Sequence, residues 1–283
     1  MPALHALVTG GSSGIGRALA RRLAAAGYDL SLVARREGLL GEAARELTGH
    51  AVRRDQRIAL FPADLCDPAQ AERAVKSAIA TLGVPDLVVT SAGMAIPGYF
   101  EDVPLAVHER TMSINYFGSL YVVRAALPAM RARGRGRILL ISSGAGLMGL
   151  FGYAPYSPSK FALRGLAEAL RAELRADNVA VSIAYPPDTE TPMLEEENKV
   201  KPEETRLITG VVKTWSADAV ADCIMRGIGR GAFAITPGWQ ITMMNRAPGL
   251  MLPLLHWYAD RLAAGVRRRR ERADRALAAL PPA

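Results

Sequence analysis

The sequence contains very little cysteine, which argues against folds built on disulfides or structural zinc. Its 283 residues include two cysteines, Cys66 and Cys223, which lie far apart and outside any CxxC or cysteine–histidine spacing. Disulfide scaffolds and zinc sites require such spacings. We therefore expect no metal site and a reducing compartment, the cytoplasm. At this length, with 50% hydrophobic residues, the chain is expected to form one large domain.

Long hydrophobic runs are also missing. Residues 1–9 have the pattern of a short apolar strand, without the charged region and long apolar stretch of a signal peptide. Near the C-terminus, residues 247–259 (APGLMLPLLHWYA) are apolar over only thirteen positions. A membrane-spanning helix needs about twenty apolar residues, so this segment is not expected to cross a bilayer alone. We expect a protein that remains inside the cell.

Acidic residues are outnumbered, and the formal net charge is +8. The excess is uneven, because residues 260–275 contain seven arginines against three acids and so hold about half of it. Surfaces that bind single-stranded nucleic acid carry aromatic side chains among their cations, and this tail has none. Nucleic acid is therefore not expected as a partner.

The sequence does contain a regular alternation of apolar strands and helical patterns. The β-prone runs show little polar alternation, which is typical of strands covered on both faces in a parallel sheet. They occupy residues 4–9, 29–34, 58–63, 86–91, 137–142, 179–185 and 233–236. The helical patterns occupy residues 15–26, 38–54, 69–82, 107–133, 161–175 and 217–226. This order predicts an α/β fold with a doubly wound parallel sheet, in a single Rossmann-type domain over residues 1–236.

Two segments interrupt this alternation, and we find no internal repeat. Residues 186–214 form a long connection after the sixth strand. Since ligands of open α/β sheets bind beyond the carboxyl ends of the strands, this connection is placed to act as a substrate lid. Residues 237–283 follow the last strand as an apolar and basic C-terminal extension.

A glycine-rich loop follows the first strand. It reads TGGSSGIG over residues 9–16, and its glycine spacing differs from GxGxxG. Glycines there let the backbone turn tightly and approach a pyrophosphate at the N-terminus of the next helix. The loop predicts a nucleotide site that includes Gly10, Ser12, Ser13, Gly14, Ile15 and Gly16. The plainer interpretation is a turn that happens to be rich in glycine.

The stretch YSPSK places a phenol and an amine four residues apart, at Tyr156 and Lys160. The proline between them suits the first turn of a helix, so both side chains share one helical face. An ammonium ~4 Å from the phenol, at an effective dielectric of ~20, contributes roughly 4 kcal/mol, or about three pK units. We expect this to bring the pKa of Tyr156 near neutrality, where the phenol can exchange a proton.

Together these motifs resemble the short-chain dehydrogenase/reductase family. The glycine loop matches its TGxxxGxG variant, Tyr156 and Lys160 match its YxxxK pair, and Ser143 lies thirteen residues before the tyrosine. The resemblance implies a catalytic set of Asn115, Ser143, Tyr156 and Lys160. In that set the serine bonds the substrate oxygen, the asparagine holds a water in a proton relay, and the lysine also holds the nicotinamide ribose.

The end of the second strand bears on which nicotinamide cofactor binds. An acid at this point normally holds a ribose 2′-hydroxyl, but this strand ends in Arg35 and Arg36. Two guanidinium groups suit a 2′-phosphate, and Ser12 adds a hydroxyl donor, so we predict NADPH over NADH. The alternative is that both arginines only face solvent.

The resemblance also implies further cofactor contacts. These are Asp64 and Leu65 at the adenine, together with Ser91, Ala92, Gly93, Pro186, Thr189 and Thr191 near the nicotinamide. Two stretches depart from the family pattern. Ser91 stands where the family usually has asparagine, and PPDTET at residues 186–191 replaces PGxVxT, so that Pro187 stiffens the position of a glycine.

Several stretches resemble one branch of this family more specifically, the reductases that convert 3-oxosphinganine to sphinganine with NADPH in sphingolipid synthesis. They include AGMAIPGYFED, SINYFGSLY, GLFGY and AYPPDTETPMLEEENKVKPEETRLI, and the resemblance covers about residues 4–209. It implies a hydrophobic ketone lipid as substrate. The alternatives are a reductase of another hydrophobic ketone, such as a steroid or oxoacyl lipid, and a non-catalytic scaffold that binds NADPH.

Apolar residues around the expected mouth of the site suit an alkyl chain, since methionine adapts to flexible ligands. They are Met94, Ile96, Leu147, Met148, Phe151, Met193 and Leu194. Plain core packing is the alternative for each of them. The acids at residues 195–197 either attract the amine of the substrate or form a solvated helix face.

The C-terminal extension has two interpretations. With Trp257 and Tyr258 beside an apolar stretch and four arginines at residues 267–270, it resembles an interfacial anchor for an anionic membrane surface. Alternatively it docks on the domain or closes a dimer and ends in a frayed basic tail. The family resemblance implies a homodimer or homotetramer that pairs through the helices at 107–133 and 161–175.

Overall fold

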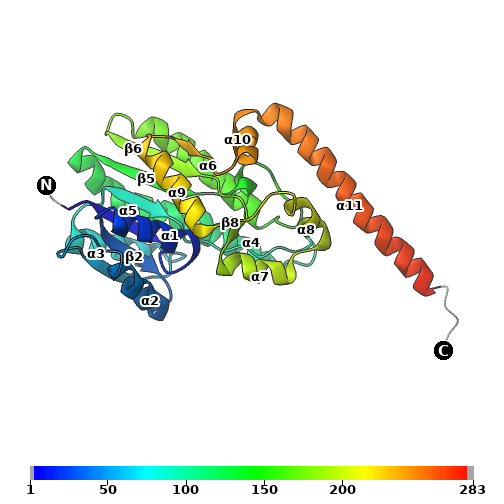
Figure 1. Cartoon of the computed structure of the whole chain (residues 1–283), viewed down its shortest axis with the longest axis horizontal. Coiled ribbons are helices and arrows are strands. Elements are labelled where there is room, and N and C mark those ends of the chain that lie inside the picture. Colours follow the sequence, from blue (N-terminus) through cyan, green and yellow to red (C-terminus); the bar gives the residue numbers. More distant parts are fainter. Residues whose placement is uncertain (1–2, 279–283) are drawn as a thin grey trace.

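The computed structural model describes residues 3–278 and has a seven-stranded parallel sheet at its centre (Figure 1). The order of its strands is β3-β2-β1-β4-β5-β6-β9. Their bounds are β1 His5–Thr9, β2 Asp29–Ala34, β3 Ile58–Pro62, β4 Leu87–Thr90, β5 Gly136–Ile141, β6 Val179–Ala184 and β9 Ala234–Ile235. The order reverses between β1 and β4, which in a doubly wound sheet is where ligands bind. The predicted doubly wound fold is confirmed.

Helices cover both faces of the sheet. One face packs against α1 (Gly14–Ala25), α2 (Glu37–Thr48) and α9 (Ala217–Gly229). The other packs against α3 (Pro68–Leu82), α5 (Gly118–Arg133) and α6 (Tyr156–Glu173). The central strands are buried along their whole length, as the lack of polar alternation predicts.

Four helices differ in extent from the sequence-based prediction by more than one residue, and one of them, predicted for 217–226, continues to Gly229. The helix predicted for 38–54 ends at Thr48, where Gly49 follows, and the amides of Val52 and Arg53 donate to the side chain of Gln56 (3.1 and 3.4 Å) instead of continuing the helix. The helix predicted for 161–175 begins earlier, at Tyr156, and ends at Glu173.

The long helix predicted for 107–133 is divided into three pieces. A π-helical turn, η1 (Ser113–Phe117), separates α4 (Leu105–Met112) from α5. Such turns insert one residue into the helical repeat and are frequent at functional sites. Here the turn contains Asn115, which is completely buried.

The connection at 186–214 folds over the carboxyl edge of the sheet (Figure 1). It contains β7 (Thr189–Glu190), α7 (Pro192–Val200) and α8 (Glu203–Thr209), and β7 pairs with β8 (Trp215–Ser216). A 3₁₀ turn, η2 (Gly144–Gly146), follows β5 on the same edge. This arrangement positions residues of the connection beside the switch point of the sheet.

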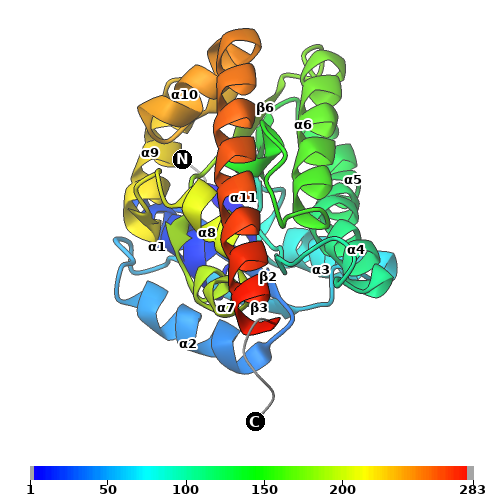
Figure 2. The ribbon, with the colours of Figure 1, turned by 90° about the vertical axis from the view of Figure 1, so that its right-hand side faces the viewer.

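The C-terminal extension is helical through the described residues. It consists of α10 (Trp239–Arg246) and α11 (Pro248–Ala278), a helix of 31 residues whose distal part lies away from the sheet (Figure 1). In the end-on view α11 crosses in front of α8 (Figure 2). The basic segment is therefore not a frayed tail as far as Ala278, and residues 279–283 of the predicted extension lie outside the described part. Within residues 3–278, no helix is long and apolar enough to span a membrane.

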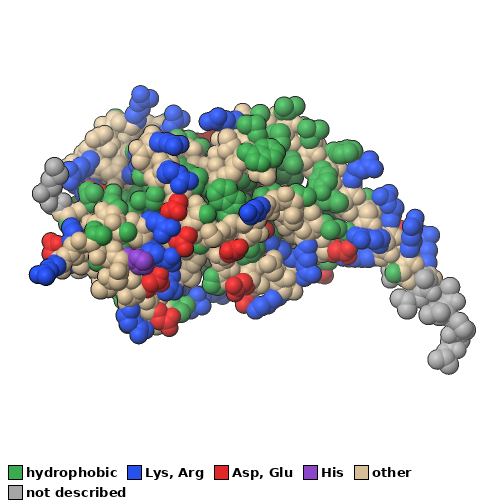
Figure 3. All heavy atoms as spheres, viewed as in Figure 1, with side chains coloured by type: hydrophobic (Ala, Val, Ile, Leu, Met, Phe, Trp, Pro, Cys, Tyr) green, Lys and Arg blue, Asp and Glu red, His purple; other side chains and the backbone are tan. Residues whose placement is uncertain are grey.

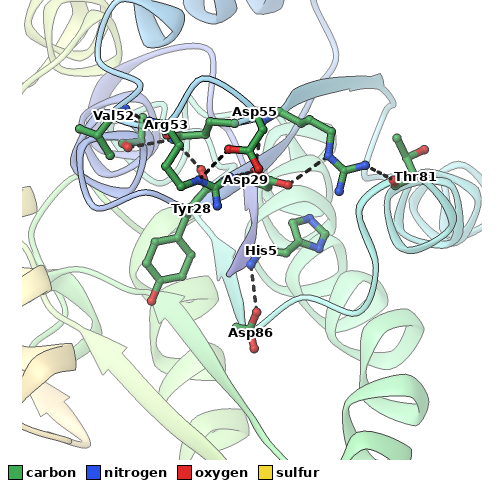
Figure 4. Close-up of polar contacts among 11 residues, drawn as sticks. His5, Tyr28, Asp29, Val52, Arg53, Asp55, Thr81 and Asp86 are labelled. Carbon is green, nitrogen blue, oxygen red and sulfur yellow. Dashed lines mark hydrogen bonds and ion pairs between the residues drawn. The ribbon is translucent and has the colours of Figure 1, made fainter. Parts of the chain in front are cut away.

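The opposite, amino edge of the sheet is held by a polar network (Figure 4). The backbone N–H of His5 donates to Asp86 (2.9 Å), and its ring Nδ1 donates to the carbonyl of Gly83 (2.7 Å). Asp29, which is 2% exposed, accepts from Arg53 (2.6 Å) and from Arg57 (3.1 Å). This network holds the starts of β1 and β2 in their parallel register, so the loops that follow the two strands begin side by side at the carboxyl edge.

Candidate functional site

A cavity at the carboxyl edge of the sheet contains most of the residues that the sequence singled out. It is lined by the glycine loop, the loop after β4, the start of α6 and the segment after β6. The predicted site residues that line it are Gly10, Ser13, Gly14, Ile15, Ser91, Ala92, Gly93, Met94, Ser143, Tyr156, Lys160, Pro186, Thr189, Thr191, Met193 and Leu194.

The glycine loop has the shape of a cradle for a phosphate group. Gly10 has φ +66°, and a Cβ there would lie 2.8 Å from the Ala92 amide nitrogen. A Cβ on Gly16 would overlap the carbonyl oxygen of Gly10. In the described part of the chain, the side chain of Ser13 makes no cap at the start of α1, and the first turn of this helix carries no acid. Its N-terminal amides are thus available to a pyrophosphate, so these residues fit a dinucleotide.

The loop after β4 is held by a residue that the sequence analysis did not single out. The hydroxyl of Thr9, at the end of β1, accepts from the amides of Ser91 (3.0 Å) and Ala92 (3.2 Å). Thr9 thus anchors the loop in which Ser91 replaces the asparagine of the family pattern. The signal in the sequence was a polar residue that ends an otherwise apolar strand.

Three polar side chains meet at the bottom of the cavity. Ser143 follows β5, and Tyr156 and Lys160 occupy the first turns of α6. Tyr156 and Ser143 are joined by a side-chain hydrogen bond. The ammonium of Lys160 lies 5.4 Å from the centre of the Tyr156 ring and donates to the carbonyl of Ile141 (3.1 Å). The structure therefore brings the predicted serine, tyrosine and lysine together.

The protonation of this group differs from the expectation that Lys160 brings Tyr156 near neutrality. Burial raises the pKa of Tyr156, the carboxylate of Glu197 raises it further, and the bond with Ser143 only partly opposes them. Burial also lowers the pKa of Lys160, to about 8. The reason is that both side chains are buried, and loss of hydration disfavours the charged form of each. This effect on the pKa of Tyr156 is larger than the opposite effect of the neighbouring ammonium. At neutral pH the phenol is uncharged and is a proton donor.

Asn115 is fully engaged in hydrogen bonds. Its amide nitrogen donates to the Met94 carbonyl (3.0 Å) and to the Ser159 hydroxyl (2.9 Å), and its amide oxygen accepts from the Met94 N–H (2.9 Å). Ser159 in turn donates to the Tyr156 carbonyl (2.6 Å). The side chain thus ties the loop after β4 to the start of α6, and its relay role stays a prediction.

The predicted nucleotide-selecting residues lie outside the cavity lining. Arg35 and Arg36 follow β2 directly, and both are exposed. Ser12 is 6% exposed within the glycine loop. The carboxylate of Asp64 accepts from the Cys66 amide (3.0 Å), and Leu65 is buried against the start of α5.

The structure separates the seven predicted substrate residues. Met94, Met193 and Leu194 line the main cavity. Met148 lines a second, apolar cavity. Leu147 is a core residue, 3% exposed, and Ile96 lines neither of these two cavities. Phe151 packs edge-on against Tyr99 and faces a hollow beside α11.

The second cavity borders the first. Both are lined by Ser143, Ala145, Leu150 and residues 186–188. From there the second one extends along apolar residues to the C-terminal helices: Met148, Ile208, Val211, Val212, Ile241, Met244, Leu255 and Tyr258. Ser143 therefore lies between the main cavity and an apolar one.

The sequence analysis treated the acids at residues 195–197 as one group with two alternatives, and the structure separates them. Glu197 is 8% exposed, lines the main cavity and accepts a hydrogen bond from Tyr153, whereas residues 195 and 196 are exposed. A signal was present in the pattern of α7, because Glu197 follows Met193 by four positions and Leu194 by three, and so shares their face. Tyr153, Asp188 and Lys201 are additional polar groups around it that the motifs did not indicate.

Comparison with known families identifies this architecture. The family model described as short chain dehydrogenase matches residues 4–202. The chain belongs to the short-chain dehydrogenase family. As a member of it, the chain is an oxidoreductase that acts on a keto or hydroxyl group, and its fold binds a nicotinamide dinucleotide.

Relatives within the short-chain dehydrogenase family include several that act on a sphingoid ketone by name. A 3-ketodihydrosphingosine reductase of Bos taurus is 43% identical over 90% of this chain and 77% of its own length. A 3-dehydrosphinganine reductase of Danio rerio is 43% identical, with coverages of 88% and 76%. A 3-ketodihydrosphingosine reductase of Dictyostelium discoideum is 36% identical, with coverages of 82% and 73%.

Solved short-chain dehydrogenases share the fold. One from Sphingobium yanoikuyae in complex with NADPH has a TM-score of 0.76 and 25% identity, over 89% of this chain and 95% of the other. One from Burkholderia phymatum in complex with NAD has a TM-score of 0.78 and 23% identity, with the same coverages.

Proposed function

We propose that this chain reduces 3-oxosphinganine to sphinganine with NADPH. The observation that carries the proposal is the position of Ser143 on the border of two adjoining cavities, one that also holds Tyr156 and Lys160 and one lined mainly by apolar side chains. A long-chain keto lipid needs both environments, one for its reacting carbonyl and one for its alkyl chain. The names of the relatives support the same substrate.

Each polar side chain has a chemical role in this reduction. The cofactor, when bound, supplies a hydride to the carbonyl carbon. The Ser143 hydroxyl bonds the carbonyl oxygen and stabilises the negative charge that develops on it. Tyr156 donates its proton to that oxygen, for which a neutral phenol is the correct form. Lys160 then stabilises the phenolate and, through the relay behind Asn115, returns a proton to it.

The apolar cavity suits the alkyl chain. Its lining contains Met148 and Met244, whose unbranched side chains adapt to a flexible ligand, and Ile208 and Leu255 from α8 and α11. In this proposal the segment 186–214 acts as the lid, since α7 and α8 contribute to the two cavities. Leu147, Ile96 and Phe151 have no part in it.

The choice of NADPH rests on Arg35 and Arg36. They are exposed directly after β2, where a bound adenosine ribose ends in the fold, and no acid is present at that point to hold a 2′-hydroxyl. Exchange of both arginines for alanine should raise the Kd of NADPH by about 10²-fold and change that of NADH little. Equal effects on the two cofactors would contradict the assignment. Exchange of Arg45 and Arg54, which lie further along, is the control for lost surface charge.

NADPH oxidation in the presence of 3-oxosphinganine tests the substrate. The expected outcome is a kcat/KM at least tenfold above those for a steroid ketone and an oxoacyl lipid. A clear preference for either of these would overturn the proposal and identify the chain as a reductase of another hydrophobic ketone. Binding of NADPH without turnover of any of the three would identify a scaffold.

We further propose that the enzyme is peripheral at an anionic membrane surface and forms a homo-oligomer. Exposed apolar residues gather over α10 and the first half of α11, while arginines follow along its distal half (Figure 3). This distribution supports an interfacial helix. Exposed aromatic residues on the faces of η1 and α6 support pairing there.

A further inference from the structure

The lid segment carries a carboxylate into the catalytic cavity. Glu197 is the one buried residue of α7 and lines the same cavity as Ser143 and Tyr156. Its neighbours in the sequence, residues 195 and 196, face solvent. A carboxylate loses its hydration when it is buried, and proteins retain such groups where a partner of opposite charge or a function compensates for this loss.

The described residues give Glu197 a hydrogen bond but no ion pair. The phenol of Tyr153 donates to it, and the ring of Tyr153 lies 5.6 Å from that of Tyr156. The nearby ammonium of Lys201 pairs instead with Asp188 (3.3 Å), and that of Lys160 bonds the Ile141 carbonyl. Within residues 3–278, no lysine, arginine or histidine nitrogen comes within ion-pair distance of the Glu197 carboxylate.

Without a further cation in the cavity, Glu197 also hinders proton donation by Tyr156. Its negative charge raises the pKa of Tyr156, which makes the phenolate left after proton donation harder to form. A cation held between Glu197 and Tyr156 would neutralise this field. The cavity therefore favours one more positive charge beside Glu197, in addition to the ammonium groups of Lys160 and Lys201 that already act on it.

We propose that Glu197 is a specificity-determining residue that binds an ammonium group on the carbon next to the substrate ketone. The inference rests on the proposed function, because 3-oxosphinganine carries its ammonium on that carbon. With the carbonyl oxygen between Ser143 and Tyr156, an ammonium three bonds away lies in the cavity that Tyr153 and Glu197 also line. The enzyme thereby selects 2-ammonio ketones from other hydrophobic ketones of equal length.

The test compares Glu197→Gln with the wild type on two substrates. Glutamine keeps the acceptor for Tyr153 and removes the charge. We expect kcat/KM for 3-oxosphinganine to fall by at least about 30-fold, as for loss of one partner of a buried charge pair. That for 1-hydroxyoctadecan-3-one, which lacks the amine, should not fall and should rise where formation of the phenolate limits the rate, because the negative charge beside Tyr156 is gone. Glu197→Asp, which keeps the charge, should retain part of the preference. Glu196→Gln, an exposed acid of the same helix, should change neither value.

Two outcomes overturn the inference. One is an equal loss on both ketones, which would make Glu197 a structural residue. The other is an unchanged preference in Glu197→Gln. A direct binding measurement separates this inference from the proposed function. Calorimetry of a short-chain sphinganine with the NADP⁺ complex should show at least a tenfold weaker Kd for the glutamine variant, even in the case that another ketone proves to be the better substrate.

Discussion

The pKa values of the individual polar groups in the main cavity depend on burial as much as on neighbouring groups. Burial raises the pKa of Tyr156 and lowers that of Lys160, so the pair starts as a neutral phenol beside an amine that titrates near pH 8. This state suits reduction, in which the tyrosine gives a proton, more than oxidation, in which it must accept one. Two predictions follow from these side chains.

Removal of the phenolic hydroxyl tests the donor role. Tyr156→Phe should lower kcat by about 10²–10⁴-fold, the usual contribution of a general acid, with the Kd of NADPH nearly unchanged. Tyr121→Phe removes the same atom from α5, outside the cavity, and should leave kcat as it is. Steady-state kinetics with a cofactor titration gives both numbers. Full activity of Tyr156→Phe would contradict the proposed mechanism, and only the proposal of cofactor binding would remain.

The amine of Lys160 should govern the pH dependence of reduction. Because its pKa is lowered to about 8, it is protonated below that pH and loses its charge above it. The return of a proton to Tyr156 needs the charged form. We therefore expect kcat/KM in the direction of reduction to be flat below about pH 8 and to fall with a slope of one proton above it. A profile that stays flat to pH 10 would show that another group supplies the proton.

A third single residue affects stability. His5 is 1% exposed, and burial lowers its pKa below the usual 6.5. Its Nδ1 donates to Gly83 and its Nε2 accepts from Ser31 (2.9 Å), which is the neutral form. Since the folded state favours neutral His5, its contribution is complete above about pH 6.5 and is lost as the pH falls towards the lowered pKa. The free energy of unfolding should decrease below pH 6.5 by up to about 1.4 kcal/mol per pH unit.

Denaturant unfolding of His5→Asn checks this value. Asparagine offers an amide to Gly83 but does not titrate, so the variant should show a shallower decrease between pH 6.5 and 5. Another histidine, His50, is exposed at the end of α2, and His50→Asn should keep the wild-type slope. The same slope in all three proteins would mean that His5 does not couple protonation to folding.

At the scale of helices and strands, the sequence predicted the strands of the main sheet and most of the helices that cover it. The apolar runs were sufficient to locate these strands, because a strand that is covered on both faces needs apolar side chains at nearly every position. The π-helical turn at Asn115 was not predictable, since its cause is tertiary: the amide of Asn115 bonds both Met94 and Ser159, 21 and 44 residues away. Motif spacing predicted three side chains that the structure brings together in one cavity, Ser143, Tyr156 and Lys160, but the inward position of Glu197 needed the fold of residues 186–214.

Helix α11 has a length that the apolar stretch alone did not indicate. Its arginines continue the helix and reach α8, where Arg269 pairs with Glu203 (2.8 Å) and Arg270 with Glu204 (3.4 Å). These two side chains hold the helix on the lid segment. The exposed residues Leu250, Leu254 and Trp257 are spaced by four and three positions and share one face, which is free to enter a lipid interface.

Vesicle binding tests this face and its charges separately. Serine at Leu250, Leu254 and Trp257 should abolish most sedimentation with phosphatidylserine-containing liposomes, because the buried apolar area is lost. Glutamine at Arg267, Arg268 and Arg272, which spares the two α8 partners, should weaken binding by roughly fivefold per charge, and only to anionic vesicles.

The control replaces two apolar residues outside α11 that are at least as exposed as Leu250, Leu254 and Trp257. Phe100 and Leu105, near the start of α4, are 73% and 72% exposed, and serine at both should leave sedimentation unchanged. Unchanged binding of the α11 variants would favour the alternative in which this helix only docks on the domain.

Over the whole molecule, contacts between distant parts of the chain close the domain and connect the lid to the extension. Arg21 and Arg22 of α1 pair with Asp218 and Asp222 of α9, so the first and last helices on one face of the sheet are linked. On the carboxyl side, the apolar cavity is walled by α8, α10 and α11 together. The extension therefore forms part of the apolar cavity, the proposed site of the alkyl chain, and its contact with a membrane would bring that cavity close to a lipid surface.

The proposed surface for pairing with a second copy is formed by η1 and α6. These two elements are in contact, and each exposes a phenylalanine, Phe117 at 40% and Phe161 at 41%. Phe117 also stacks on Tyr121 at 6.0 Å, which extends the aromatic surface onto α5. Large exposed apolar side chains on neighbouring helices favour an interface, since burial against a partner removes them from water.

Arginine at Phe117 and Phe161 should break this pairing. Sedimentation velocity should give the wild type a mass of at least twice 30.3 kDa and the double variant a mass near 30.3 kDa, because two unpaired charges would have to be buried in each copy. Phe100→Arg places the same charge on a more exposed phenylalanine away from this face and should leave the mass as it is. A monomeric wild type, or a double variant that still pairs, would contradict the assignment of this face and direct the search for an interface to α10 and α11.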